Sequence, residues 1–211
     1  MLGENLIIGQ DFEKIAEKLK EIFISQINGS TKKFIITVAG ESGSGKSGIS
    51  KSLADYLTGE GIKTIIIQQD DYFLFPPQTN EMKRHKDINR VGPEEVNLKL
   101  LQYHVDLINK NEEIIKPLVI FDENKITEEK ISLPEVKVVI VEGTYTSVLE
   151  NISKKIFIDR IYLETKKERI IKAREKQDRF LENVLEIEHK IISKHKEKAN
   201  IIITKEFEII E

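Results

Sequence analysis

The residues with the clearest chemical potential lie between Gly40 and Ser47, in the string GESGSGKS. Their G-x-x-x-x-G-K-S spacing is typical of a phosphate-binding loop. Glycines carry no Cβ and tolerate positive φ, so successive backbone N–H groups can turn toward one anion, while Lys46 adds charge near the outer phosphates. The Ser47 hydroxyl can ligate Mg²⁺. The predicted binding site for a nucleoside triphosphate is therefore the whole loop: Gly40, Glu41, Ser42, Gly43, Ser44, Gly45, Lys46 and Ser47.

Acidic residues follow two other apolar runs. Asp70 and Asp71 come after KTIIIQ at 63–68, and Glu142 comes directly after VKVVIV at 136–141. In an open parallel sheet, ligands bind beyond the carboxyl ends of the strands, where the phosphate loop also lies. Asp70 and Asp71 are candidates for a general base or for holding metal-bound water, and Glu142 is a candidate metal-site anchor. The alternative interpretation for each is an ordinary turn or capping residue.

Two basic segments could reach a bound anion. The run at 83–86 (KRHK) is either a solvated face or a set of groups that approach a phosphate. Thr165 to Glu168 form a predicted capping box that opens a long, charged helix. Arginine spreads charge over the oxygens of a phosphoryl group in transfer, and Arg169 and Arg174 are the favoured candidates on that helix.

The elements that must position these residues follow from hydrophobic patterning. Buried strands are predicted at 34–39, 63–68, 136–141, 155–159 and 199–204, with 206–210 as a candidate edge strand. Helical patterns cover 11–26, the segment after Ser47, the segment from Gly92 to Ile108 and that from Leu181 to Ile192. Short extended pieces at 116–121 and 125–133 predict a hairpin over the site, whereas 75–91 is predicted as a polar loop. These elements predict an α/β, doubly wound, five-stranded parallel sheet.

Length and composition restrict the alternatives. The chain has 211 residues, 33 basic and 36 acidic, with a net charge of −3. Neither a nucleic-acid partner nor a membrane-spanning segment is expected from this charge and patterning. The absence of cysteine excludes disulfides and thiol-ligated zinc, and it is compatible with a cytoplasmic protein. One domain covering 1–211 is expected, with an acceptor-side insertion at about 72–135 and a basic lid helix at about 165–180.

The motifs together resemble those of the uridine kinase and phosphoribulokinase family of P-loop kinases. The resemblance runs in collinear order from about Lys33 to Thr204. It rests on six strings: GESGSGKS at 40–47, QDDYF at 69–73, GPEEVN at 92–97, VVIVEG at 138–143, KIFID at 155–159 and KEKANIII at 196–203.

The resemblance implies phosphoryl transfer from ATP, with Mg²⁺, to a hydroxyl of a small-molecule substrate. It makes Asp70 the catalytic carboxylate, with Lys46, Arg169 and Arg174 on the phosphates. Ser47, Glu142 and Asp70 become the metal-site residues. The acceptor would contact Asp71, Tyr72, Phe73 and Phe121. The resemblance also makes a homo-oligomer possible, although no feature of the sequence specifies an interface.

The acceptor is the part of the resemblance that fits least well. Uridine kinases have an aspartate before a His-Pro pair, whereas Val91 here precedes Gly92 and Pro93. The aromatic residues that surround the pyrimidine in uridine kinases fall near 119–121, and in this chain only Phe121 is aromatic there. A nucleoside (uridine or cytidine) is the first hypothesis for the acceptor, and a sugar, a sugar phosphate or another hydroxyl metabolite is the alternative. GTP is not excluded as the donor.

Two other classes of protein were weighed. A regulatory GTPase needs an Asn-Lys-x-Asp element, and the nearest string, at 124–127, ends in Thr127. A nucleotide-binding regulator without transfer activity is the second, because the acceptor-side residues are altered. The presence of Asp70 and Glu142 favours an enzyme over both.

Overall fold

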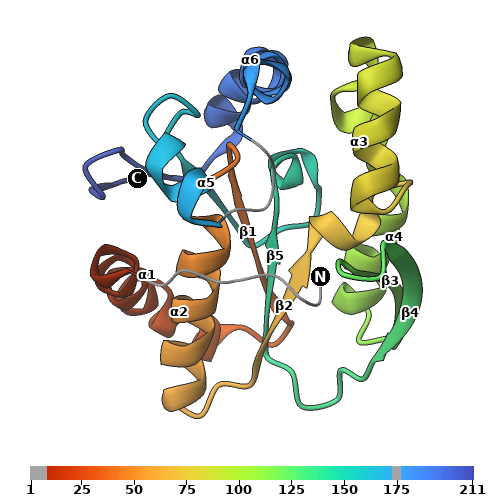
Figure 1. Ribbon diagram of the computed structural model, residues 1–211. Helices are drawn as coiled ribbons and strands as arrows, with labels where there is room; N and C mark the ends of the chain where they lie inside the picture. Colours follow the sequence, from red (N-terminus) through yellow and green to blue (C-terminus); the bar gives the residue numbers. More distant parts are fainter. Residues whose placement is uncertain (1–8, 173–176) are drawn as a thin grey trace.

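A computed structural model of the chain describes residues 9–172 and 177–211, with the backbone alone at Lys172 (Figure 1). It contains a six-stranded sheet in the order β2-β5-β1-β6-β7-β8. The first five strands are parallel, and β8 pairs antiparallel to β7 at the edge. The strands are β1 (Phe34–Gly40), β2 (Thr64–Gln68), β5 (Val138–Glu142), β6 (Lys154–Ile158), β7 (Ile201–Ile203) and β8 (Ile209–Ile210). The predicted doubly wound α/β fold is confirmed, with the sixth strand at the position expected for an edge strand.

Helices cover both faces of this sheet. Alternate residues of β1 point to opposite sides: Ile36 packs with α1 (Gln10–Gly29) and α2 (Lys46–Gly59), whereas Ile35 packs with α4 (Leu98–Asn109). Figure 1 shows α1 and α2 on one side of the sheet and α4 on the other. A separate antiparallel hairpin, β3 (Ile114–Ile120) with β4 (Lys125–Ile131), lies beside α4. Two apolar layers therefore hold the central strand, and with it the phosphate loop.

The loop prediction for 75–91 is wrong. This segment contains α3 (Pro77–Lys86) and a single 3-10 turn, η2 (Ile88–Arg90). Asn80 is the only buried residue of α3, so the helix has no apolar stripe that the sequence could reveal. Polar contacts hold it instead, because Arg84 donates to the buried carboxylate of Glu95 through Nε and an Nη, each at 2.8 Å.

Two helix boundaries also differ from expectation. Pro93 does not begin the following helix: η3 (Pro93–Glu95) is an isolated 3-10 turn, and α4 begins at Leu98 with Asn97 as its N-cap. The Asn97 side chain accepts a hydrogen bond from the Leu100 N–H, so the helix begins after this N-cap and not at Pro93. The predicted helix over 165–180 is interrupted, because α5 is described over Lys166–Lys172 and a second helix, α6 (Arg179–Ile192), begins at Arg179 with Asp178 as its cap.

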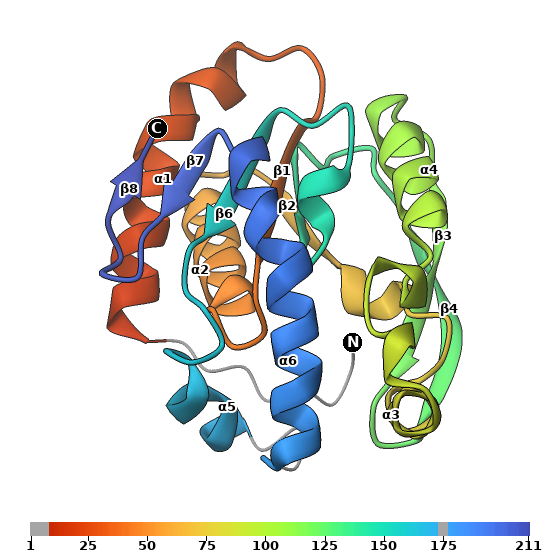
Figure 2. The same cartoon turned by 90° about the horizontal axis from the view of Figure 1, so that it is seen from above.

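The predicted capping box at Thr165 does not form. The Glu168 carboxylate binds Arg160 at 2.7 Å instead, and the Thr165 N–H donates to the Ile161 carbonyl. Figure 2 shows α5 and α3 on opposite sides of α6, at the same end of the sheet. Three short 3-10 turns complete the structure: η1 (Gln69–Tyr72), η4 (Thr146–Val148) and η5 (Ser193–Lys198). Within the described part of the chain, no helix has the length and apolar character needed to cross a membrane.

Candidate active site

Strand register brings the predicted functional segments to one edge of the sheet. Glu142, the last residue of β5, is level with Val38 of β1 on one side and with Gln68 of β2 on the other. The phosphate loop begins two residues after Val38, and Asp70 follows Gln68 by two residues. Since the strands are parallel, their carboxyl ends face the same crevice, which is where ligands bind in open α/β sheets.

The loop after β1 has the backbone of an anion cradle. Gly43 and Gly45 have φ values of +79° and +106°, which a residue with a Cβ would adopt only with strain. A Cβ on Gly43 would also lie 2.9 Å from the Arg169 Cγ. The Lys46 Nζ donates to the Glu41 carbonyl at 2.8 Å, so this ammonium lies over its own loop. The loop leads directly into the N-terminus of α2, where helix N–H groups favour a bound phosphate.

Oxygen donors for a divalent cation meet beside this loop. The Ser47 hydroxyl donates to Glu142 Oε1 at 3.1 Å, and the Gln68 amide reaches the same oxygen at 3.2 Å. Among the described residues, no group of three or more histidine or carboxylate side chains could enclose a metal ion. A hydroxyl and one carboxylate therefore fit Mg²⁺, which retains waters and shares phosphate oxygens, better than a metal that needs a full protein cage.

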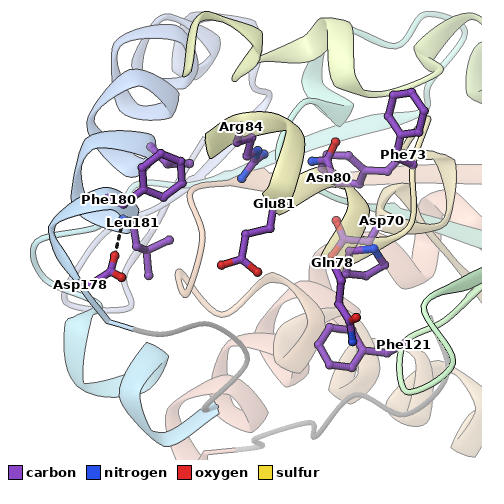
Figure 3. Close-up of a pocket in the computed structure, with 13 residues that line it drawn as sticks. Asp70, Phe73, Gln78, Asn80, Glu81, Arg84, Phe121, Asp178, Phe180 and Leu181 are labelled. Carbon is purple, nitrogen blue, oxygen red and sulfur yellow. Dashed lines mark hydrogen bonds between the residues drawn. The ribbon is translucent and has the colours of Figure 1, made fainter. Parts of the chain in front are cut away.

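Asp70 faces a cavity of about 270 Å³ next to this edge (Figure 3). Phe73 and Phe121, two of the predicted acceptor residues, line the same cavity. Its other walls come from α3 and α6. The side chain of Gln69, next to Asp70, accepts from the Tyr145 N–H at 2.6 Å. Gly143 makes room for it, because a Cβ there would lie 2.3 Å from the Gln69 Cβ.

Asp71 and Tyr72, the other two predicted acceptor residues, lie inside the protein. Asp71 is 1% exposed and binds Lys116 Nζ at 2.7 Å and the Val119 N–H at 3.0 Å, both in β3. Tyr72 is 1% exposed, and its hydroxyl lies 2.8 Å from His104 Nδ1. Burial raises the pKa of Tyr72 well above its ordinary value, and the Asp71 charge adds to this effect. These two side chains attach η1 to the hairpin and to α4.

A family model described as "Phosphoribulokinase / Uridine kinase family" matches residues 35–203, which is most of the chain. The chain belongs to this family. A uridine kinase of Leuconostoc citreum (strain KM20) is 27% identical over 184 residues, covering 82% of this chain and 87% of that protein.

Solved structures agree in fold. Phosphoribulokinase from Rhodobacter spheroides superposes with a TM-score of 0.65 at 16% identity, over 83% of this chain and 71% of that one. D-glycerate 3-kinase from Cryptococcus neoformans var. grubii superposes with a TM-score of 0.64 at 12% identity, over 93% of this chain and 98% of that one. The family match makes the chain a P-loop kinase of the phosphoribulokinase/uridine kinase family, and the solved structures share its fold.

Two arginines in the basic segment after β6 lie against the phosphate loop. Arg169 is 6% exposed and donates to Thr165 Oγ1 at 2.9 Å, while that hydroxyl donates to the Ser42 carbonyl. Arg160 reaches the Ser44 carbonyl at 3.4 Å and binds Glu168. Burial opposes ionisation of Glu168, but the Arg160 hydrogen bond and a backbone N–H outweigh it, and the pKa of this carboxyl is lowered. Arg174 lies outside the described residues.

Sequence reasoning missed several contacts of this site. Glu41 Oε1 lies 2.6 Å from His189 Nδ1 of α6, and Glu41 Oε2 accepts from the Tyr162 N–H. Arg160 could have been found from its place just after a parallel strand, since such positions face the crevice. No pattern in the sequence indicates that α6 returns to the phosphate loop.

Proposed function

We propose that this chain transfers the γ-phosphoryl group of ATP, with Mg²⁺, to a hydroxyl group of a small metabolite. A nucleoside, uridine or cytidine, is the first candidate acceptor. The strongest support is the location of Asp70, which lines a cavity at the sheet edge that also carries the phosphate loop and Glu142. We further propose one kinase domain, in which about 72–135 form the acceptor side and about 165–180 the lid.

Each residue has a defined task in this proposal. The loop N–H groups and Lys46 hold the phosphates, and Arg169 and Arg174 add positive charge around the transferred group. When bound at Ser47 and Glu142, Mg²⁺ neutralises phosphate charge. Asp70 accepts the proton of the attacking hydroxyl. Phosphoryl transfer needs mainly positioning and charge neutralisation, so this small set of groups is sufficient.

A second cavity, of about 220 Å³, fits the base of the nucleotide donor. Gly43, Gly45 and Gly48 line it on the loop side, and Phe12, Arg160 and Phe207 line it elsewhere. The Arg160 guanidinium lies 4.8 Å from the centre of the Phe207 ring. A planar guanidinium beside an aromatic ring suits a flat heterocycle. We therefore propose that the base of ATP binds in this cavity, beside the packed Arg160 and Phe207 side chains, while its phosphates lie on the loop.

The acceptor can also be a sugar, a sugar phosphate or another hydroxyl metabolite. The uridine kinase, phosphoribulokinase and glycerate kinase among the similar proteins support this range. A nucleotide-binding regulator without transfer activity is the remaining alternative, since Asp71 and Tyr72 are engaged in internal contacts.

A coupled ADP-release screen tests the proposal. Purified protein with Mg·ATP is assayed against nucleosides, pentose phosphates, pantothenate and glycerate, and products are identified by mass spectrometry. Lys46→Ala should abolish release. Lys51→Ala is the matched control, because Lys51 lies on α2 but its exposed ammonium binds Asp55. ATP binding without any phosphorylated product would favour the regulator.

A further inference from the structure

The apolar walls of the Asp70 cavity come from three separate segments. Phe73 and Phe75 lie between η1 and α3, Phe121 directly follows β3, and Phe180 belongs to α6. Pro77, Leu181 and Val184 extend these walls. Aromatic faces from opposite sides favour a ligand with a flat, weakly polar body.

Most of the charged residues that line this cavity are acidic. Asp70, Glu81 and Asp178 line it, and Figure 3 shows the Glu81 carboxylate extending into the space between Asp178 and Gln78. Asp178 Oδ1 accepts from the Leu181 N–H at 3.0 Å, which fixes this carboxylate at the start of α6. Glu81 belongs to α3, and its side chain is 56% exposed.

Arg84 is the single cation among the described residues that line the cavity, and its charge is already compensated. Its guanidinium makes two 2.8 Å bonds to Glu95 and one 3.3 Å contact to Glu188. Both carboxylates are largely buried, with 2% and 12% of their side chains exposed. This arrangement holds α3 against α6, and it leaves the lining acidic overall.

Lys83 and His85, two other members of the basic run at 83–86, contact aromatic rings, and His85 Nε2 also lies 4.0 Å from Glu81 Oε1. Lys83 Nζ lies 4.1 Å from the centre of the Phe75 ring, and His85 stacks on Phe180 at 3.7 Å. Neither residue is part of the described lining. The basic run, which the sequence offered as a candidate anion site, therefore supports the walls of the cavity.

We infer that the cavity selects ring-containing acceptors that carry no negative charge, with cationic rings bound best, and that Glu81 is the residue that sets this preference. The inference rests on the proposed function for the role of the cavity. Like charges at close range disfavour binding of an anion, and solvent around the exposed Glu81 side chain keeps the effect modest. A cation gains from both the carboxylates and the aromatic faces.

Compounds matched in shape and different in charge test this inference. Binding of 3-methylcytidine (cationic at pH 7), cytidine (neutral) and orotidine (anionic) is measured by saturation-transfer NMR and calorimetry. The neutral 4-(hydroxymethyl)benzamide and the anionic 4-(hydroxymethyl)benzoate form a second pair, with a ring but without a nucleobase. The neutral member of each set should bind roughly tenfold more tightly than the anion, and the cationic nucleoside should bind more tightly still.

Variants at Glu81 locate the effect. Glu81→Gln should reduce the ratio of neutral to anionic binding affinity several-fold. Glu81→Lys should make the anionic compounds bind more tightly than the neutral and cationic ones. The matched control is Glu94→Lys, since Glu94 is an exposed acid of η3 outside the described lining. Thermal denaturation of each variant checks the fold, which should be unaffected because the Glu81 side chain is exposed.

The outcomes separate this inference from the proposed function. If binding follows the expected order but no ADP is released, the transferase proposal fails and the inference stands. Tighter binding of the anions, equal binding within each set, an unchanged order in Glu81→Lys, or no binding at all would overturn it. Turnover of an anionic acceptor in preference to its neutral partner would overturn the inference, but it would support the proposed kinase activity.

Discussion

Lys116 Nζ lies 2.7 Å from Asp71 Oδ2, and both side chains are almost completely buried, at 4% and 2% exposure. Asp71 directly follows Asp70, while Lys116 belongs to the hairpin that carries Phe121. This ion pair therefore joins the candidate base to the opposite wall of the cavity. A buried pair contributes little net stability, but loss of one partner leaves an uncompensated charge.

Lys116→Met should lower the free energy of unfolding by about 3–5 kcal/mol, as measured by urea denaturation. The double variant Asp71→Asn/Lys116→Met should recover a large part of that loss. Lys130→Met is the control, because Lys130 makes an exposed pair with Glu113 in the same hairpin, and its cost should stay below about 0.5 kcal/mol. Equal losses in the single and double variants would rule out the buried-charge explanation.

The contact between Ser47 and Glu142 predicts a specific metal dependence. Ser47→Ala or Glu142→Gln should raise the Mg²⁺ concentration for half-maximal ATP turnover by roughly 10–100-fold. Ser52→Ala provides a matched control on the same helix, since the buried Ser52 hydroxyl has no hydrogen-bond partner among the described residues. An unchanged magnesium requirement in both site variants would remove these residues from the metal site.

The bond between Glu41 and His189 connects the phosphate loop to α6. His189→Ala should weaken ATP binding by less than the roughly 1.5–3 kcal/mol of a hydrogen bond to a charged group, because the bond positions the loop and does not contact ATP. His189→Asn, which keeps a donor, should restore part of the loss. Calorimetry with ATP measures both, and identical affinities for wild type and His189→Ala would show that the contact is incidental.

Two buried histidines predict an acid-sensitive fold. Burial lowers the pKa of His104, with Lys116 adding to the effect, and burial also lowers the pKa of His195, with a contribution from Lys198. The unfolded chain therefore binds more protons than the folded chain once the pH falls below the ordinary histidine pKa of about 6.5. The free energy of unfolding should decrease as the pH falls through that range.

Denaturation at a series of pH values tests this expectation. His104→Gln and His195→Gln should each reduce the slope between about pH 7 and 5, because each removes one group whose pKa changes on folding. A slope that is the same in the double variant as in the wild type would assign the acid sensitivity to other groups.

Much of the fold could be predicted from the sequence because strand patterning and the phosphate-loop spacing are local signals. Ile35 and Ile36 belong to a continuous apolar run, which is typical of a strand covered on both faces. The helix α3 could not be found this way, because its contacts are the Arg84 and Glu95 pair and the stacking of His85 on Phe180. Such contacts depend on which segments meet in space.

The candidate site also combines residues that local sequence patterns reveal with residues whose place depends on tertiary packing. Glu142 and Gly40 were predicted at the sheet edge because strand ends gather there, and the register agrees. The internal positions of Asp71 and Tyr72 could not be inferred, because they depend on how the hairpin packs on η1. Phe180 and Glu81 were missed as cavity residues because their place depends on how α6 and α3 pack, and α3 itself was predicted as a loop.

If Asp70 is the base in phosphoryl transfer, replacing its carboxylate with an amide in Asp70→Asn must slow the transfer step. At saturating Mg·ATP and the acceptor that the screen identifies, kcat should fall by about 10²–10⁴-fold. ATP affinity, measured by calorimetry on the same preparation, should stay close to that of the wild type. Turnover at the wild-type rate in Asp70→Asn would contradict the assignment of Asp70 and the mechanism built on it.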